Sequence, residues 1–218
     1  MKTVAVVSGG LDSTVMLHWL LEQGHDVRAL SVDYGQRHIR ELICAKKLCH
    51  ILNVRHEIAD LSGISHLLGG SSQTDPSIPV PEGHYAGESM RLTVVPNRNA
   101  IMLSVATAWA ISMKADNVAY GAHAGDHEVY PDCRAVFASA MDVVMRLADW
   151  HEVGLLRPFI NKTKAEIISL GAIMKVPFEL TRSCYNAREK HCGRCSTCFE
   201  RRESFITAGV DDPTEYEN

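Results

Sequence analysis

Short apolar runs rich in β-branched residues alternate along this chain with longer segments in which apolar residues recur every three or four positions. The short runs are typical of buried strands, and the longer segments are typical of amphipathic helices. The runs predict strands at Lys2–Val7, Val27–Asp33, Arg55–Ala59, Asn117–Tyr120 and Leu155–Phe159. The longer segments predict helices at about Ser13–Gln23, Arg37–Leu52, Asn97–Met113, Cys133–Ala148 and Lys162–Met174.

Strands that alternate with helices in this way imply a parallel sheet with right-handed crossovers and helices on both faces. The predicted fold class is therefore α/β, a doubly wound parallel sheet. On the second helix, the residues expected to face the core are Ile39, Leu42, Ile43 and Leu48. Because ligands of such sheets bind beyond the carboxyl ends of the strands, the segments to examine first are Ser8–Ser13, Asp33–Gln36 and Gly121–Asp126.

Two parts of the chain lack this periodicity. Leu61–Pro96 is interrupted by glycines and prolines and predicts a long loop, which in compact domains usually has a function. The C-terminal part carries four cysteines and ends in an acidic tail, Asp211–Asn218, which is expected to fray. We therefore expect a main domain over residues 1–181 and a segment over residues 182–218 that packs on the same domain.

Composition narrows the class of protein. The 218 residues are 46% hydrophobic and 22% charged, as in ordinary globular proteins. The formal net charge of -4 gives no basic surface, which argues against direct contact with nucleic acid. No apolar run approaches the ~20 residues of a membrane-spanning helix, and none resembles a signal peptide. A cytoplasmic protein without a membrane partner is expected.

The segment between the first strand and the first helix reads Ser8-Gly9-Gly10-Leu11-Asp12-Ser13. Adjacent glycines permit positive φ, so successive backbone N–H groups can converge on an anion, and the helix N-terminus adds donors. The hydroxyls of Ser8, Ser13 and Thr14 are further donors, whereas the Asp12 carboxylate suits a helix cap or Mg²⁺. An ordinary capped turn is the alternative, but the register of strand, loop and helix favours phosphate binding. Neither G-x4-G-K-[ST] nor G-x-G-x-x-G occurs.

Ser-Gly-Gly-x-Asp-Ser at the end of the first strand resembles the loop of the PP-loop ATP pyrophosphatase superfamily. Three further motifs are Asp33–His38, Val95–Asn99 and Tyr130–Arg134. With the C-terminal cysteines, they resemble the 7-cyano-7-deazaguanine synthase family of queuosine biosynthesis, from Val4 to about Phe205. The resemblance implies a ligase that uses ATP and Mg²⁺ and joins ammonia to 7-carboxy-7-deazaguanine through adenylated carboxylate and amide intermediates. It also implies a homodimer.

The resemblance also suggests roles for individual residues. Residues 8–14 would bind the pyrophosphate end of ATP, and Val32 and Asp33 would border adenine. Catalytic roles fall to Asp12, Arg98 and Lys164, although a surface ion pair for Arg98 and a solvated helix start for Lys164 are alternatives. Lys162 is the weaker candidate of the two lysines. The candidate substrate contacts are Asp126, Asp132 and Arg134, with a helix cap as the alternative for Asp132.

The cysteine cluster is a separate site. Cys184-x7-Cys192-x2-Cys195-x2-Cys198 has the spacing of four thiolate ligands of structural Zn²⁺. A reducing compartment disfavours disulfides. An iron–sulfur cluster is the alternative, but the x3-Cys-Pro continuation of bacterial ferredoxins is missing. Four protein ligands leave no open position, so the metal is expected to be structural.

Two other functions stay open at this point. One is a PP-loop enzyme that modifies tRNA itself. Such an enzyme would need a basic surface to bind RNA and usually carries a further domain. The other is a nonenzymatic ATP-binding module, which explains the loop and the cysteines but not Val95–Asn99 or Tyr130–Arg134.

Overall fold

The computed structural model describes residues 1–84 and 88–217. Its sheet contains five parallel strands in the order β3-β2-β1-β4-β5. The strand bounds are β1 (Lys2–Val6), β2 (Asp26–Asp33), β3 (Arg55–Asp60), β4 (Asn117–Ala119) and β5 (Gly154–Leu156). Val4 of β1 pairs with Arg28 of β2 on one side and with Val118 of β4 on the other. The predicted parallel sheet is confirmed with five strands, but the last strand is Gly154–Leu156 and ends before residues 157–159 of the predicted Leu155–Phe159.

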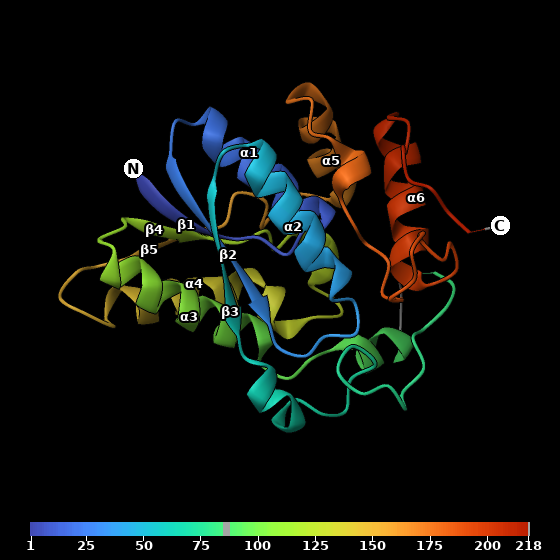
Figure 1. The fold of residues 1–218 in the computed structure, drawn as a ribbon, viewed down its shortest axis with the longest axis horizontal. Coiled ribbons are helices and arrows are strands. Elements are labelled where there is room, and N and C mark those ends of the chain that lie inside the picture. Colours follow the sequence, from blue (N-terminus) through green and yellow to red (C-terminus); the bar gives the residue numbers. More distant parts are fainter. Residues whose placement is uncertain (85–87, 218) are drawn as a thin grey trace.

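Helices cover both faces of the sheet, as Figure 1 shows. Their bounds are α1 (Leu11–Glu22), α2 (Arg40–Ile51), α3 (Arg98–Ser112), α4 (Ala135–Arg146), α5 (Lys164–Ile173) and α6 (Ser196–Ala208). One apolar cluster joins the sheet to α3 and α4 through Leu103 and Met141. A second cluster joins the other face to α1, α2, α5 and α6 and includes Val15, Ile167 and Phe205.

The strand order reverses direction beside β1. From β1 the chain runs outward through β2 to β3, and it then returns to add β4 and β5 on the other side. Such a switch point leaves a crevice outside the carboxyl ends of the two central strands, which is where ligands of doubly wound sheets bind. The segments after β1, β2 and β4 therefore border one space.

On α2 the predicted inward face is partly wrong. Leu42 and Leu48 are buried, whereas Ile39 and Ile43 are 46% and 64% exposed. Ile39 lies before the first helical residue, and the buried stripe continues from Leu42 through Ala45, Leu48 and Cys49. This stripe follows helical spacing from Leu42, which leaves Ile43 turned toward solvent.

The C-terminal tail is not frayed, contrary to the expectation for Asp211–Asn218. Asp212 accepts a hydrogen bond from Arg201 at 3.2 Å and another from the Tyr216 hydroxyl at 2.6 Å. The backbone N–H of Glu217 donates to the carbonyl of His191 at 2.8 Å. The tail folds back because Arg201, 1% exposed, needs a carboxylate partner. Asn218 lies outside the described residues.

The long loop over Leu61–Pro96 contains two short 3-10 helices, Ser62–Leu67 and Glu88–Thr93, in its described part; residues 85–87 lie outside it. The loop runs beside the cysteine segment in Figure 1, where the N–H of Gly83 donates to the carbonyl of Arg194 at 3.0 Å. No helix within the described residues is both long and apolar enough to cross a membrane.

Candidate active site

The loop after β1 has a shape that only glycine permits at its second position. Gly9 has φ +89°, and a Cβ there would lie 2.1 Å from the carbonyl oxygen of Glu41 in α2. The loop is thus pressed against α2. Gly10 occupies the cap position of α1 and no side chain caps the helix, so the first N–H groups of α1 remain available to an anion.

Hydroxyl groups fix the rest of the loop. The Ser8 and Ser13 side-chain oxygens lie 3.1 Å apart, and the Ser13 Oγ accepts from the Ser8 N–H at 3.2 Å. The Oγ of Thr14 is buried and makes no hydrogen bond. From the opposite side, the N–H of Arg182 donates to the Gly9 carbonyl at 3.0 Å. The loop is therefore held in place before any ligand binds.

A pocket of about 1160 Å³, partly open to solvent, lies over this loop and the ends of β1, β2 and β4. Of the residues predicted from sequence, those that line it are Ser8, Gly10, Leu11, Asp12, Ser13, Val32, Arg98, Asp126 and Lys164. These residues come from five separate segments, and the strand order brings them together.

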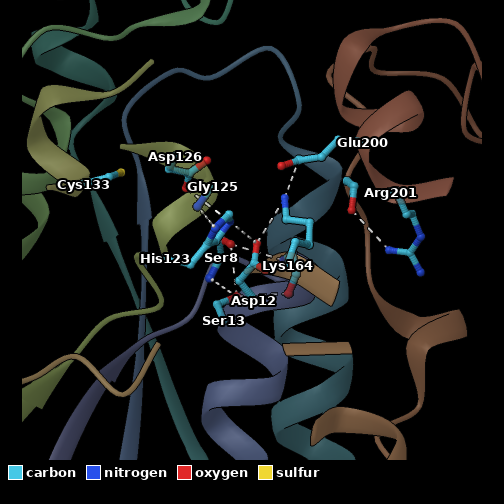
Figure 2. Close-up of polar contacts among 12 residues, drawn as sticks. Ser8, Asp12, Ser13, His123, Gly125, Asp126, Cys133, Lys164, Glu200 and Arg201 are labelled. Carbon is cyan, nitrogen blue, oxygen red and sulfur yellow. Dashed lines mark hydrogen bonds and ion pairs between the residues drawn. The ribbon is translucent and has the colours of Figure 1, made fainter. Parts of the chain in front are cut away.

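Charged groups gather at one end of the pocket, as Figure 2 shows. The Lys164 Nζ lies 2.5 Å from a carboxylate oxygen of Glu200 and 3.7 Å from Asp12 Oδ2. Burial by itself lowers the pKa of Lys164, but Asp12 and Glu200 raise it above its ordinary value. The lysine is therefore fully charged at neutral pH. His123 and Asp126 complete this group, with the His123 Nε2 lying 3.7 Å from Asp12 Oδ2 and 3.4 Å from Asp126 Oδ2.

A second group of charges lies across the pocket. Arg98, the first residue of α3, has its guanidinium 5.9 Å from the centre of the Tyr130 ring, and its Nε makes no hydrogen bond. Burial raises the pKa of Glu41 to about 8, against the opposing effect of Arg98 and Arg182. Burial and the neighbouring Arg98 lower the pKa of His38 to about 4. His38 and Glu41, 3.7 Å apart, are therefore largely neutral at pH 7, and the arginines supply the positive charge here.

Some predicted residues lie elsewhere. Asp132 accepts from the Asn99 N–H in the first turn of α3 at 3.0 Å, so it caps that helix, and it does not line the pocket. Arg134 is exposed and donates to the carbonyl of His127 at 2.9 Å, also outside the lining. Asp33 accepts from the Gly35 N–H at 3.0 Å in the turn after β2. Gly9 and Thr14 shape the loop from behind the pocket wall.

Several lining residues did not emerge from the sequence, among them Glu41, Arg182, Tyr185 and Glu200. Three of these, Arg182, Tyr185 and Glu200, belong to the cysteine segment, so this segment forms one wall of the pocket. Glu200 lies two residues after Cys198 in an Arg- and Glu-rich helix, and no local pattern distinguishes it from its exposed neighbour Glu203. Tyr185 follows Cys184, and its hydroxyl oxygen lies 2.9 Å from the hydroxyl oxygen of Tyr130.

The four C-terminal cysteines form a compact group. Their Sγ atoms all lie within 4.8 Å of one another, and Cys195 Sγ lies 3.4 Å from Cys198 Sγ and 4.0 Å from Cys184 Sγ. Four sulfurs around zinc, at Zn–S distances of about 2.3 Å, stand roughly 3.8 Å apart. Backbone N–H groups point at the sulfurs, as from Cys195 to Cys192 Sγ at 3.3 Å. This donor set fits a tetrahedral metal site.

The parallel sheet, the glycine loop at the end of β1 and the pocket beside it define an α/β protein of the PP-loop kind. A solved structure of the same fold is NMN synthetase from Francisella tularensis, with a TM-score of 0.54, 15% sequence identity, and coverage of 96% of this chain and 77% of that one. At this identity the likeness concerns the fold alone.

A family model described as queuosine biosynthesis protein QueC matches residues 2–209, and the chain belongs to this family. It is 51% identical over 216 residues to the 7-cyano-7-deazaguanine synthase of Pseudoalteromonas translucida, with 99% of both chains covered. It is 48% identical to the enzyme of the same name from Psychromonas ingrahamii, covering 100% of this chain and 98% of that one.

Proposed function

We propose that this protein is an ATP-dependent ligase that converts 7-carboxy-7-deazaguanine and ammonia to 7-cyano-7-deazaguanine in queuosine biosynthesis. The observation that carries the proposal is the glycine loop and helix α1, which face a pocket that also holds Arg98 and Lys164. Its second support is membership of the family over nearly the whole chain.

The chemistry requires such a site. Ammonia does not displace oxide from a carboxylate, because oxide is too poor a leaving group. Adenylation of the carboxylate by ATP turns this oxygen into part of AMP, which leaves readily, and ammonia then forms the amide. Adenylation of the amide oxygen followed by its loss gives the nitrile. The protein must align the reacting oxygen with the α-phosphate and offset the negative charge that develops.

The proposed roles follow from position. Backbone N–H groups at the start of α1 and the hydroxyls of Ser8 and Ser13 bind the pyrophosphate end of ATP, and Val32 borders adenine. Lys164 donates to phosphate oxygens from one side of the pocket, and Arg98 binds an anionic group of nucleotide or substrate from the other. Asp12 would help to hold Mg²⁺, which when bound would neutralise part of the negative charge of the phosphates. Asp132 and Arg134 have no substrate role in this proposal.

The proposal includes one Zn²⁺ bound by Cys184, Cys192, Cys195 and Cys198, which holds the segment over residues 182–218 on the main domain of residues 1–181. It also includes free ammonia as the nitrogen source, a homodimer, a cytoplasmic location, and small-molecule substrates without direct contact to nucleic acid.

The test is a product analysis. Protein is incubated with 7-carboxy-7-deazaguanine, ammonium chloride and α-labelled ATP. We expect labelled AMP, pyrophosphate and the nitrile, with two AMP formed per nitrile. Labelled ADP in place of AMP would contradict adenylation. Turnover with a tRNA substrate but not with the free base would favour an enzyme that modifies tRNA.

A further inference from the structure

The charged end of the pocket gathers side chains from four separate elements, and Figure 2 shows them pointing at one another. Asp12 comes from the first turn of α1, Lys164 begins α5, and Glu200 lies in α6. Asp126 and His123 come from the loop after β4. One ligand atom each from His123, Asp126 and Glu200 lie within 4.8 Å of one another. Asp12 Oδ2 lies beside this group, 3.7 Å from both His123 Nε2 and Lys164 Nζ, so three carboxylates border the space that the lysine enters.

The histidine orients this group and does not add a ligand. Its Nδ1 accepts a hydrogen bond from the Gly125 N–H at 3.1 Å, so in the neutral ring the proton is on Nε2. His123 is 1% exposed, and its Nε2 makes no hydrogen bond although it points at Asp12 and Asp126. An Nε2–H in this position attracts the oxygens of both carboxylates, which lie 3.7 Å and 3.4 Å away.

The positions of the carboxylates suit a divalent cation. Lys164 Nζ already lies among them, 2.5 Å from Glu200 and 3.7 Å from Asp12, so the space accommodates a cation. Phosphate oxygens on the loop of Ser8–Ser13 would attract the same ammonium, because lysine is a common phosphate donor. Once Lys164 turns to phosphate, three carboxylates facing an anionic nucleotide need another cation between them. Oxygen ligands of this kind, shared with phosphate, are those that Mg²⁺ takes.

We propose that Glu200, from the cysteine segment, binds the divalent cation of the nucleotide together with Asp12 and Asp126, and that this cation takes the place that Lys164 occupies beside Glu200. The inference rests on the proposed use of ATP. In this inference Asp126 binds the metal, whereas from the sequence it was expected to contact the substrate. The inference also gives the segment around the structural metal a direct part in nucleotide binding, through a residue two positions beyond Cys198.

The test uses Mn²⁺ as the probe, with EPR of bound Mn²⁺ as the readout, and needs no turnover. Zinc-loaded protein is titrated with Mn²⁺ in the presence of α,β-methylene-ATP, and the same titration without protein corrects for binding to the nucleotide alone. We expect Glu200→Gln to weaken Mn²⁺ binding by about 10- to 100-fold at unchanged zinc content and melting temperature. Glu203→Gln is the matched control, since Glu203 is exposed on the same helix, and it should bind Mn²⁺ as the unmodified protein does.

Equal Mn²⁺ affinity in Glu200→Gln and the unmodified protein would overturn the assignment. If Glu200→Gln lost zinc or stability, Asp126→Asn, which lies outside the cysteine segment, would decide by the same titration. Lys164→Met should bind Mn²⁺ without nucleotide, because the competing ammonium is gone; failure to do so would disprove the exchange. The AMP and pyrophosphate assay is independent of these titrations, so a failure of the ligase function is recognised separately.

Discussion

The phosphate loop and the cysteine segment, residues 182–217, both border the pocket, but different forces hold them. The loop follows a buried strand and leads into a buried helix, and Val7 and Leu11 on either side of it belong to the core. The cysteine segment joins the same core through Phe205 of α6, but the apolar cluster around its cysteines is small, with the four cysteines packed against Val80, Tyr185 and Tyr216. The loop therefore takes its shape from the chain itself, whereas we propose that the cysteine segment owes much of its shape to a bound metal ion. Because residues of both regions line the pocket, a metal bound by the cysteines would help to shape the site, although the cysteines themselves are not among the lining residues.

The largest expected effect is loss of the metal in the cysteine segment. Cys195→Ser removes one of four thiolates, and because the site does not exist in the unfolded chain, the lost free energy of metal binding is lost folding free energy. We expect zinc content to fall from one per chain and the melting temperature to fall by at least about 10 °C. Metal analysis and thermal unfolding measure the two together.

Cys44→Ser is the control, because Cys44 lies in α2, away from the cysteine group. It should retain both zinc and stability. A metal-free Cys195→Ser protein that unfolds at the temperature of the unmodified protein would show that the segment holds its shape without the ion, and the contrast between the two regions would disappear.

The next effect concerns Lys164, which contacts both regions through Asp12 of the loop helix and Glu200 of the segment. Lys164→Ala should lower kcat by about 10²- to 10³-fold, as expected when a charged donor to a phosphate is removed, with zinc content unchanged. Lys162→Ala is the matched control: Lys162 lies two residues earlier and does not line the pocket, so turnover should stay near normal. Equal losses in the two variants would argue against a specific role for Lys164.

A smaller effect tests the loop itself. Gly9→Ala places a Cβ 2.1 Å from the Glu41 carbonyl at a φ of +89°, so both the loop and α2 must move. We expect the free energy of unfolding to fall by about 3 kcal/mol or more and nucleotide binding to weaken, both measured on zinc-loaded protein. Gly24→Ala is the control, with φ +74° but nothing within 4 Å of the added Cβ, and it should cost only about 1 kcal/mol.

The same contrast explains how much the sequence could predict. The sheet, five of the helices and the loop follow from local periodicity and from glycine spacing, because those signals lie within a few residues of one another. Helix α6 was missed because its polar sequence, rich in Arg and Glu, lacks a continuous apolar stripe, and burial of Arg201 against Thr181, Ser183 and Asp212 stabilises it instead.

The site residues differ in the same way: some have a local sequence signal, and others depend on contacts between distant segments. Arg98 was found because it lies in the Val95–Asn99 motif, and Lys164 was found through the family resemblance; both begin helices and line the pocket. Glu200 was not found, because its importance arises only when α6 packs beside α5. The alternative role considered for Asp132, a helix cap, is the contact it makes, although the helix it caps is α3 and not the one that follows it. Such contacts between distant segments have no signal in the local sequence.

The smallest effect concerns the buried carboxyl group of Glu41, which lies behind the loop on α2. Burial raises its pKa from 4.5 to about 8, so between these values the folded protein keeps a proton that the unfolded chain has lost. The contribution of this group to stability is therefore full below pH 4.5 and is lost as pH rises toward 8.

The variant Glu41→Gln removes this titration. Urea unfolding should give the variant and the unmodified protein similar stability at pH 5, and the variant should be more stable by about 1–3 kcal/mol at pH 8. Glu179→Gln, at an exposed position, should show no such change with pH. A constant difference between Glu41→Gln and the unmodified protein over this range would mean that Glu41 is ionised in the folded state and paired with Arg98 and Arg182, so that the wall behind the loop is held by charge, as Arg201 is held in the cysteine segment.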